Sequence, residues 1–159
     1  METDEMARAD RLCFEDFEAG QTDSFGHYEV TEAEIVDFAR KYDPQPFHLD
    51  RDAARNSLFG DLCASGWHIC AMTMRMMVDH MDANGGSSLG SPGVDEIRWR
   101  KPVFPGDVLR VELTILETRR SRKYPAMGIV KNAYKVLNQR DEVVMTFIAN
   151  AFFPARNPV

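Results

Sequence analysis

Cysteine is scarce in this sequence, and the few cysteines are poorly arranged for cross-linking or for holding a metal. The chain of 159 residues contains three of them, Cys13, Cys63 and Cys70. An odd number with no C-x-x-C pair argues against a disulfide framework and against a zinc ribbon. We therefore expect three reduced thiols in the core of a cytoplasmic protein.

Long apolar runs and a secretory start are also missing. The first ten residues, METDEMARAD, are acidic and lack an apolar core. The longest apolar run, residues 66–78, is too short to span a bilayer and is interrupted by Arg75. No repeat or linker divides the chain, whose length suits one domain. We expect a single soluble domain over residues 1–159, with a core from about residue 14 to about residue 153, flexible ends and no membrane association.

Charge is distributed unevenly along the chain. Residues 1–97 hold 7 Lys and Arg against 20 Asp and Glu, whereas residues 98–140 hold 11 against 3. The basic part could meet an anionic partner, but it has no nucleic-acid motif or aromatic platform and the net charge is −6, so we expect no nucleic-acid binding. Two explanations stay open, a sheet edge protected by cations and a site for a phosphorylated small molecule.

Apolar periodicity predicts three helices. Residues 31–42 begin with a capping box, Thr31 and Glu34, and carry apolar side chains on one face. Residues 51–59 form a short second helix, which the following glycine ends. Apolar residues cover almost the whole circumference of residues 66–81, a pattern typical of a buried helix.

Alternating patterns predict strands around that buried helix. Turn signals such as PVFPGD and NQRD separate the segments. One buried helix with several antiparallel strands indicates an α+β fold in which a curved sheet wraps around residues 66–81. The predicted strands are residues 25–30, 94–99, 107–120, 128–138 and 142–153.

Asp43 and His48 stand on either side of a stiff segment. Residues 43–48 are DPQPFH, and each proline restricts both its own backbone and the residue before it. A carboxylate and an imidazole fixed in this way can grip one water molecule, one group removing a proton while the other orients the water or delivers a proton. The alternative, open at this stage, is that Asp43 only ends a helix and His48 is a capped loop histidine.

Ser65 and Gly66, at the start of the buried helix, form a second candidate feature. Free N–H groups at a helix N terminus make a donor site for an oxyanion, and glycine lets a ligand approach the backbone closely. The alternative is that Ser65 only caps the helix and Gly66 only packs. Together the two features predict hydration or dehydration of an α,β-unsaturated acyl group, in which the donors stabilise an enolate and the held water adds to or leaves the carbon chain.

The other histidines are assigned simpler roles. His68 could add a third ligand to Asp43 and His48, but metal sites use better-defined clusters, so we expect no metal. His27 and His80 are expected to be surface or packing residues.

The buried helix also carries an Arg75–Asp79 pair and several methionines. The spacing of the pair is that of a helical ion pair. The methionines are expected to fill the core, although a pliable face could also line an acyl tunnel. They are Met72, Met74, Met76, Met77 and Met81.

Two stretches resemble the MaoC-like dehydratases, relatives of the (R)-specific enoyl-CoA hydratases with a hot-dog fold. They are FARKYDPQPFHLDRDAARNSLFGDLCASGWHICAMTMRMMVD and GSPGVDEIRWRKPVFPGDVLRVELTILE. The family motif is Asp, any residue, Asn, Pro, any residue, His, and residues 43–48 match it with Gln45 in place of Asn. Gln45 leaves the Asp and His in place but can alter how the loop is braced.

The resemblance implies a single MaoC-like hot-dog domain that forms a dimer, with each site near the subunit interface. It implies that Asp43 and His48 activate water, that the Gly66 N–H binds the thioester oxygen, and that Ser65 supports one or the other. Coenzyme A would be part of the substrate, with no metal or redox cofactor. Basic side chains on the strands would bind the phosphates of coenzyme A. The sequence does not decide which of the following do so: Arg98, Arg100, Lys101, Arg119, Arg120, Arg122 and Lys123.

We therefore expect a hydro-lyase of fatty acid metabolism that converts a trans-2-enoyl thioester reversibly into an (R)-3-hydroxyacyl thioester, as a homodimer or higher homo-oligomer. Two alternatives remain open. A hot-dog acyl-CoA thioesterase would aim the water at the carbonyl carbon. A non-catalytic acyl-CoA binding subunit would keep the pocket without turnover.

Overall fold

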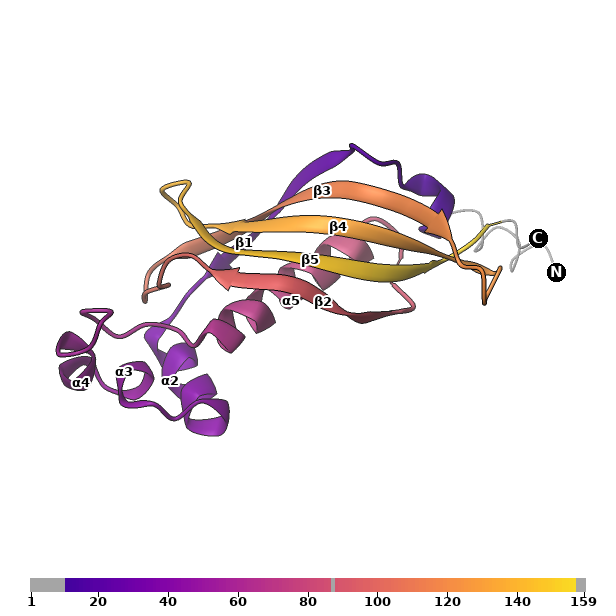
Figure 1. Cartoon of the computed structure of the whole chain (residues 1–159). Helices are drawn as coiled ribbons and strands as arrows, with labels where there is room; N and C mark the ends of the chain where they lie inside the picture. The colour runs from indigo at the N-terminus through magenta and orange to yellow at the C-terminus, as the bar shows by residue number, and fades with distance from the viewer. Residues whose placement is uncertain (1–10, 87, 157–159) are drawn as a thin grey trace.

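A curved antiparallel sheet lies along one long helix in the computed structural model, which describes residues 11–86 and 88–156 (Figure 1). This is the hot-dog arrangement, and the α+β fold expected from the sequence is confirmed. The strands are β1 (Thr22–Glu29), β2 (Gly90–Trp99), β3 (Val108–Arg120), β4 (Met127–Leu137) and β5 (Val143–Pro154). The helices are η1 (Phe14–Asp16), α2 (Glu32–Tyr42), α3 (Pro46–Leu49), α4 (Arg51–Arg55) and α5 (Gly66–Ala83).

The sheet has the strand order β1-β3-β4-β5-β2, and every neighbouring pair is antiparallel. On β4 buried and half-buried side chains alternate, because successive residues point to opposite faces of a strand. The edge strand β2 is less regular, with register shifts between Gly90 and Gly93 and between Asp95 and Arg98. The two edges of the sheet are therefore β1 and β2.

Helix α5 packs its buried side against the concave face of the sheet. Ile69, Met72 and Met76 are no more than 4% exposed and belong to the main core with strand residues such as Val111 and Val136. The sequence predicted burial all round this helix, and for the single chain that prediction is wrong. Exposed fractions of 59% at Trp67, 52% at Met74 and 37% at Val78 leave one apolar side of α5 uncovered by its own sheet.

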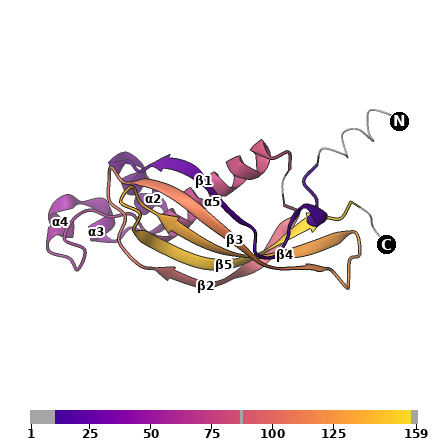
Figure 2. The same cartoon turned by 90° about the horizontal axis from the view of Figure 1, so that it is seen from above.

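The short helices gather at one end of the molecule. Seen from above, α3 and α4 extend beyond the end of the sheet (Figure 2). The other end carries η1 and the end of β5, where Arg156 Nη2 pairs with Asp16 at 2.8 Å. The N-terminal end of α5 and its C-terminal end thus have different surroundings.

Helix boundaries agree with the sequence except between residues 46 and 59. The capping bond of α2 is present, with the Glu34 N–H donating to Thr31 Oγ1 at 3.2 Å. The helix predicted over residues 51–59 ends at Arg55, because Ser57 Oγ donates to the Ala54 carbonyl and turns the chain away. Residues 46–49, for which the sequence predicted no helix, form the short α3.

Several smaller predictions can be compared directly. The cysteines are free thiols, and the Arg75–Asp79 ion pair is present at 2.6 Å. His27 is exposed beside Glu29. Within residues 11–86 and 88–156, the helices are all too short or too polar to cross a membrane.

Candidate active site

Asp43 ends helix α2. Its backbone N–H donates to the Ala39 carbonyl at 2.9 Å, which closes the last turn. Its own φ and ψ, −148° and 67°, are not helical, as expected for a residue before Pro44. The side chain is only 18% exposed. The carboxylate is therefore held, largely buried, at the C-terminal end of α2.

His48 is fixed by the carbonyl oxygen of Cys63. Pro46 starts α3, where a missing N–H costs nothing, and two residues later His48 is buried at 5% exposure. Its Nδ1 lies 2.6 Å from the Cys63 oxygen. Because a carbonyl can only accept, Nδ1 carries the proton, and Nε2 of the neutral ring is an acceptor. This Nε2 lies 3.4 Å from Asp43 Oδ2.

The Asp43 carboxylate is braced by two donors. Ser65 Oγ donates to Oδ2 at 2.6 Å, and Gln45 Nε2 donates to Oδ1 at 2.7 Å. Burial raises the pKa of Asp43, but the hydrogen bonds from Ser65 and Gln45 and the nearby His48 outweigh it, so the pKa is lowered. Asp43 is thus ionised at neutral pH. Ser65 stands at the N-cap position of α5 without making a capping bond, so it serves the carboxylate and not the helix.

Asp43 Oδ2 and His48 Nε2 are two acceptors that face each other. Their separation of 3.4 Å exceeds the usual range of about 2.7–2.9 Å for a charge-assisted N–H···O bond. A water molecule has two O–H donors and can serve both atoms at once. The pair is therefore suited to hold one water, with the lone pairs of its oxygen directed outward.

Gly66 begins α5 and is closely covered by Trp99. A Cβ added at Gly66 would lie 2.4 Å from Trp99 Cε2, and Trp99 Nε1 donates to the Gly66 carbonyl at 3.0 Å. The first N–H groups of a helix have no partner within it. Because the Ser65 side chain bonds elsewhere, the N–H groups of the first turn of α5 are available to an oxygen atom. Gly66 is both a packing residue and a potential donor.

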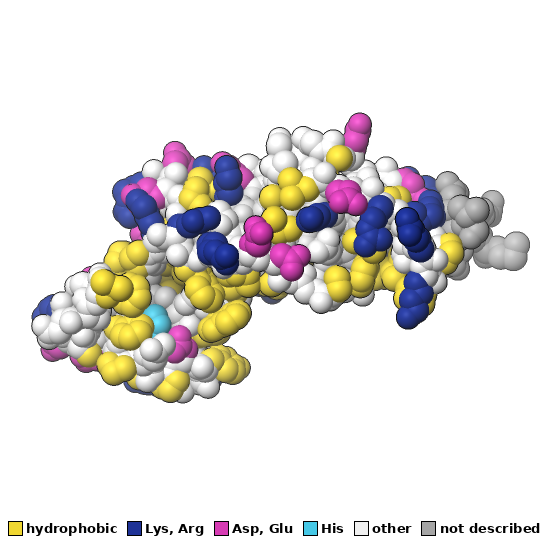
Figure 3. Space-filling view, viewed as in Figure 1, with side chains coloured by type: hydrophobic (Ala, Val, Ile, Leu, Met, Phe, Trp, Pro, Cys, Tyr) yellow, Lys and Arg dark blue, Asp and Glu magenta, His cyan; other side chains and the backbone are white. Residues whose placement is uncertain are grey.

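These groups line one hollow of about 410 Å³. Figure 3 shows it between the helical end and the sheet, bordered by hydrophobic side chains, with histidine and acidic side chains at the surface. All four residues singled out in the sequence, Asp43, His48, Ser65 and Gly66, belong to its wall. Their catalytic role stays a prediction.

The seven cationic side chains considered as phosphate partners lie in three places. Arg100 and Lys101 line the hollow, and Lys101 Nζ also pairs with Glu142 at 2.6 Å. Arg98 is exposed and donates to the carbonyl of its neighbour Ile97. The remaining cations lie on or next to the β3–β4 turn, at the opposite end of the sheet from α3 and α4 (Figure 1); these are Arg119, Arg120, Arg122 and Lys123.

His68 is buried on another side of α5. Its ring stacks on Phe38 with centroids 4.7 Å apart, and its Nδ1 has no hydrogen-bond partner among the described residues. Burial lowers the pKa of His68, against the opposite influence of Glu34. In the described ranges, no three His, Cys, Asp or Glu side chains are grouped as a metal site would need.

Sequence reasoning missed the aromatic wall. Trp67 and Trp99 make an edge contact with centroids 5.4 Å apart, are 59% and 45% exposed, and line the hollow beside Gly66. Trp99 ends a predicted strand, but nothing in its neighbourhood along the chain indicates that β2 brings it to the start of α5. The role of the Cys63 carbonyl as the partner of His48 could not be predicted either, because every residue has the same backbone carbonyl and the sequence does not distinguish one from another.

Comparison with known families and structures agrees with this geometry. The family described as MaoC like domain matches residues 16–136. The crystal structure of the MaoC-like dehydratase from Rhodospirillum rubrum is 41% identical with a TM-score of 0.81, covering 92% of this chain and 99% of that one. The unliganded R-hydratase PhaJ1 from Pseudomonas aeruginosa is 26% identical with a TM-score of 0.68, covering 91% and 86%.

A shorter segment of this chain is similar to part of a larger protein. Mesaconyl-CoA hydratase from Cereibacter sphaeroides is 37% identical over 62 residues, which is 39% of this chain. The match spans only 18% of that protein's length.

Proposed function

Because the chain belongs to the MaoC-like domain family, we propose that it is a hydro-lyase that adds water reversibly to a trans-2-enoyl thioester and forms an (R)-3-hydroxyacyl thioester. The observation that carries the proposal is the pair of acceptors Asp43 Oδ2 and His48 Nε2, 3.4 Å apart, in the same hollow as the first turn of α5. Similarity to the R. rubrum dehydratase and the P. aeruginosa R-hydratase supports it.

The reaction starts from a water that donates one O–H to each acceptor. As the water oxygen bonds to C3 of the enoyl group, His48 Nε2 takes one of its protons. The proton that His48 already carries stays on Nδ1, hydrogen-bonded to the Cys63 carbonyl. Asp43, ionised and braced by Ser65, orients the water and stabilises the imidazolium that forms.

The electrons of the C2–C3 double bond move toward the thioester carbonyl as C3 is attacked. The carbonyl oxygen becomes an enolate oxygen, and the Gly66 N–H at the positive end of the α5 dipole stabilises its charge. The enolate then collapses, and C2 takes the proton that His48 Nε2 removed. The OH and H of one water are thereby added to C3 and C2, and the reverse sequence is dehydration.

This step needs neither a metal nor a redox cofactor. All electrons move between bonds of the substrate and the water. The formal oxidation of C3, which gains the OH, is balanced by the formal reduction of C2, which gains the H. The buried Cys63 thiol next to His48 is not a competing nucleophile, because burial raises its pKa to about 11, with a further contribution from Asp61.

We propose coenzyme A as the thioester carrier. Arg100 lies on the wall of the hollow, and the exposed Trp67 and Trp99 offer an apolar surface to the pantetheine arm. The similarity to a mesaconyl-CoA hydratase agrees with this choice. A place in fatty acid metabolism in the cytoplasm, with reduced thiols, is part of the same proposal.

We also propose a homodimer. The edge strand β2 exposes unpaired backbone groups together with Val94 and Trp99, and α5 exposes Met74 and Val78. A second copy that paired along β2 would cover these side chains and enclose the hollow, which one chain leaves open.

The test is the loss of conjugated enoyl absorbance when the purified protein is added to crotonyl-CoA and to longer enoyl-CoAs. Loss with formation of the R product, abolished in Asp43→Asn, is expected. Asp37→Asn is the matched control, since Asp37 is an exposed acid on the same helix that pairs with Lys41 and is not part of the wall of the hollow.

Other outcomes distinguish the alternatives. Release of free thiol from a saturated acyl-CoA would assign a thioesterase in place of a hydratase. Tight binding of enoyl-CoA without conversion, at every chain length tested, would assign a non-catalytic binding subunit.

A further inference from the structure

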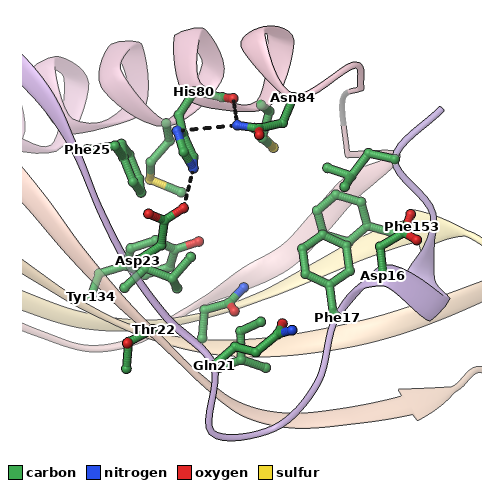
Figure 4. Close-up of a pocket in the computed structure, with 16 residues that line it drawn as sticks. Asp16, Phe17, Gln21, Thr22, Asp23, Phe25, His80, Asn84, Tyr134 and Phe153 are labelled. Carbon is green, nitrogen blue, oxygen red and sulfur yellow. Dashed lines mark hydrogen bonds and ion pairs between the residues drawn. The ribbon is translucent and has the colours of Figure 1, made fainter. Parts of the chain in front are cut away.

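A second cavity of about 370 Å³ lies between the C-terminal half of α5 and the sheet (Figure 4). Its first α5 residue, Met77, is eleven residues after Gly66, or about 16 Å along the helix axis at about 1.5 Å per residue. Met72 and Met76, 2% and 4% exposed, belong to the packed core on the intervening turns. The cavity is therefore separate from the hollow that holds Asp43 and His48.

Most of the wall is apolar. The side chains of Leu113 and Ile115 come from β3, and Met77 and Met81 come from α5. At one end Phe17 packs on Phe153, with ring centroids 4.4 Å apart. A concave apolar cavity in the range of about 300–1,000 Å³ with a few converging polar groups has the usual form of a small-molecule site.

The first polar group is a histidine held by an acid. His80 Nε2 lies 2.7 Å from Asp23 Oδ2 on β1, and its ring stacks on Phe25 with centroids 4.0 Å apart and planes 2° apart. Asn84 Nδ2 donates to the His80 carbonyl at 2.7 Å. Figure 4 shows His80, Asp23 and Asn84 together on one side of the cavity. The sequence predicted a surface or packing role for His80, which this geometry extends.

The second polar group lies deeper, on β4. Asn132 is 4% exposed, and its Nδ2 reaches the Val130 carbonyl only at 3.5 Å, the far limit of a hydrogen bond. Tyr134, 7% exposed, lies two residues along the same face of the strand. Burial raises the pKa of Tyr134 to about 12, against a smaller effect of its hydrogen bond with Asn132, so its hydroxyl stays protonated. Both groups are neutral hydrogen-bonding partners.

The charges of the wall decide what kind of head group fits. Two carboxylates, Asp16 and Asp23, face the cavity, so an anionic head would be repelled. Asp16 is already paired with Arg156, and Asp23 with His80. The other polar side chains of the wall include amides and a phenol, which are neutral and suit an uncharged group that can donate and accept.

We propose that this cavity is a second ligand site, which binds an uncharged aliphatic molecule of medium length that ends in a hydroxyl group. The chain lies among the apolar side chains of α5 and β3, and the hydroxyl meets Asn132 and the His80–Asp23 pair. The site does not depend on the activity proposed above, because no residue of its wall belongs to the hollow of Asp43 and His48.

Decanol is the probe, and decanoate is its charged counterpart of similar length. Calorimetric titration of the full chain is expected to show one decanol per chain with a Kd of the order of 100 µM. Decanoate at pH 8 is expected to bind about tenfold more weakly or worse, because its carboxylate meets Asp16 and Asp23. Equal affinity for the two probes, or no binding of decanol, would overturn the proposal.

A filling variant locates the site. Met81→Trp is expected to weaken decanol binding about tenfold or more by occupying the cavity, while Asp82→Trp, at the next and exposed position of α5, leaves it unchanged. Both variants are expected to hydrate crotonyl-CoA at the wild-type rate. Unchanged decanol affinity in a folded Met81→Trp would place the binding elsewhere and overturn the proposal.

Methionine methyl NMR tests the wild-type chain without any substitution in the cavity. Decanol is expected to shift the methyl signals of Met77 and Met81 and to leave that of Met74, on the exposed side of α5, in place. Shifts confined to other methionines would overturn the assignment. So would a KM of Met81→Trp that rises for a long enoyl-CoA and not for crotonyl-CoA, since the cavity would then hold the substrate's own chain.

Discussion

His48 Nδ1 lies 2.6 Å from the carbonyl oxygen of Cys63, and this bond decides which nitrogen of the ring is available for chemistry. Because the Nδ1–H donates a hydrogen bond to the carbonyl, Nε2 is the nitrogen that faces Asp43. The segment before α5 therefore sets the tautomer of a residue fifteen positions earlier in the chain, and the same segment supplies Ser65 to the carboxylate.

Two substitutions at His48 separate the structural from the chemical role. The amide nitrogen of His48→Asn comes near the place of Nδ1 and keeps the bond to Cys63, whereas His48→Gln leaves that buried carbonyl without a donor. We expect both to lose about 10²–10⁴-fold in turnover, because neither amide is a base. Only His48→Gln is expected to lose about 1–3 kcal/mol in the free energy of unfolding. Turnover and denaturant titration check this, and near-normal hydration by His48→Asn would refute the assignment.

Ser65→Ala is expected to shift the pH profile. The Ser65 hydroxyl donates to the ionised form of Asp43, so its loss raises the pKa of that carboxyl. Since the carboxylate is the active form, the acidic limb of kcat/KM should move to higher pH. The lowered pKa also stabilises the fold above the unfolded pKa and loses this effect as pH falls through the folded pKa. The stability difference between wild type and Ser65→Ala should therefore shrink at acid pH, and a pH profile identical to wild type would contradict the role of Ser65.

The sequence predicted the site well where the information is local. DPQPFH is a stiff unit whose two prolines and two chemical groups stand within six residues, so Asp43 and His48 could be paired from the chain alone. The bracing of Asp43 by Ser65 could not, because it joins residues 22 positions apart through a tertiary contact. Gln45 was predictable only in part. The sequence shows that it replaces the Asn of the family motif, but it does not show that the Gln45 side chain donates to Asp43 Oδ1.

The fold was predictable to a similar extent. Apolar periodicity identified α5 and four of the strands to within a few residues, because each buries one face against the core. It could not tell which side of α5 its own sheet covers, since a face buried by a second copy is just as apolar as one buried by the chain itself. Met72 and Met74 look alike in sequence, yet they are 2% and 52% exposed.

Gly66→Ala is expected to destabilise the protein. The added methyl group would overlap the indole of Trp99, which is rigid and held by its bond to the Gly66 carbonyl. We expect a loss of about 1–3 kcal/mol in the free energy of unfolding, together with lower turnover as the first turn of α5 shifts. In a double-mutant cycle, Gly66→Ala should cost less in a Trp99→Ala background, where room exists for the methyl group. Strictly additive effects would show that the two side chains do not collide.

Arg100→Ala is expected to weaken carrier binding and leave the chemical step intact. If Arg100 meets a phosphate of coenzyme A, its loss should raise KM for crotonyl-CoA about tenfold with kcat unchanged. Crotonyl-pantetheine, which has no phosphate, should be hydrated equally by wild type and variant. Arg122→Ala is the matched control, because Arg122 stands at the β3–β4 turn, away from the hollow. A rise in KM for Arg122→Ala and not for Arg100→Ala would reassign the phosphate site to that turn.

Met74→Glu is expected to separate the proposed dimer into monomers. Met74 is 52% exposed in the single chain and shares the open side of α5 with Val78. A charge in the middle of a covered apolar face has no partner there. The free energy needed to desolvate it exceeds the favourable free energy of the contacts that the face makes. Sedimentation velocity should show a dimer for wild type and a monomer for Met74→Glu. Leu58→Glu should remain dimeric, since Leu58 is 97% exposed but lies in the turn after α4. If the hollow is completed at the dimer interface, the Met74→Glu monomer should lose turnover while keeping its fold. A fully active monomer would mean that one chain holds the whole site.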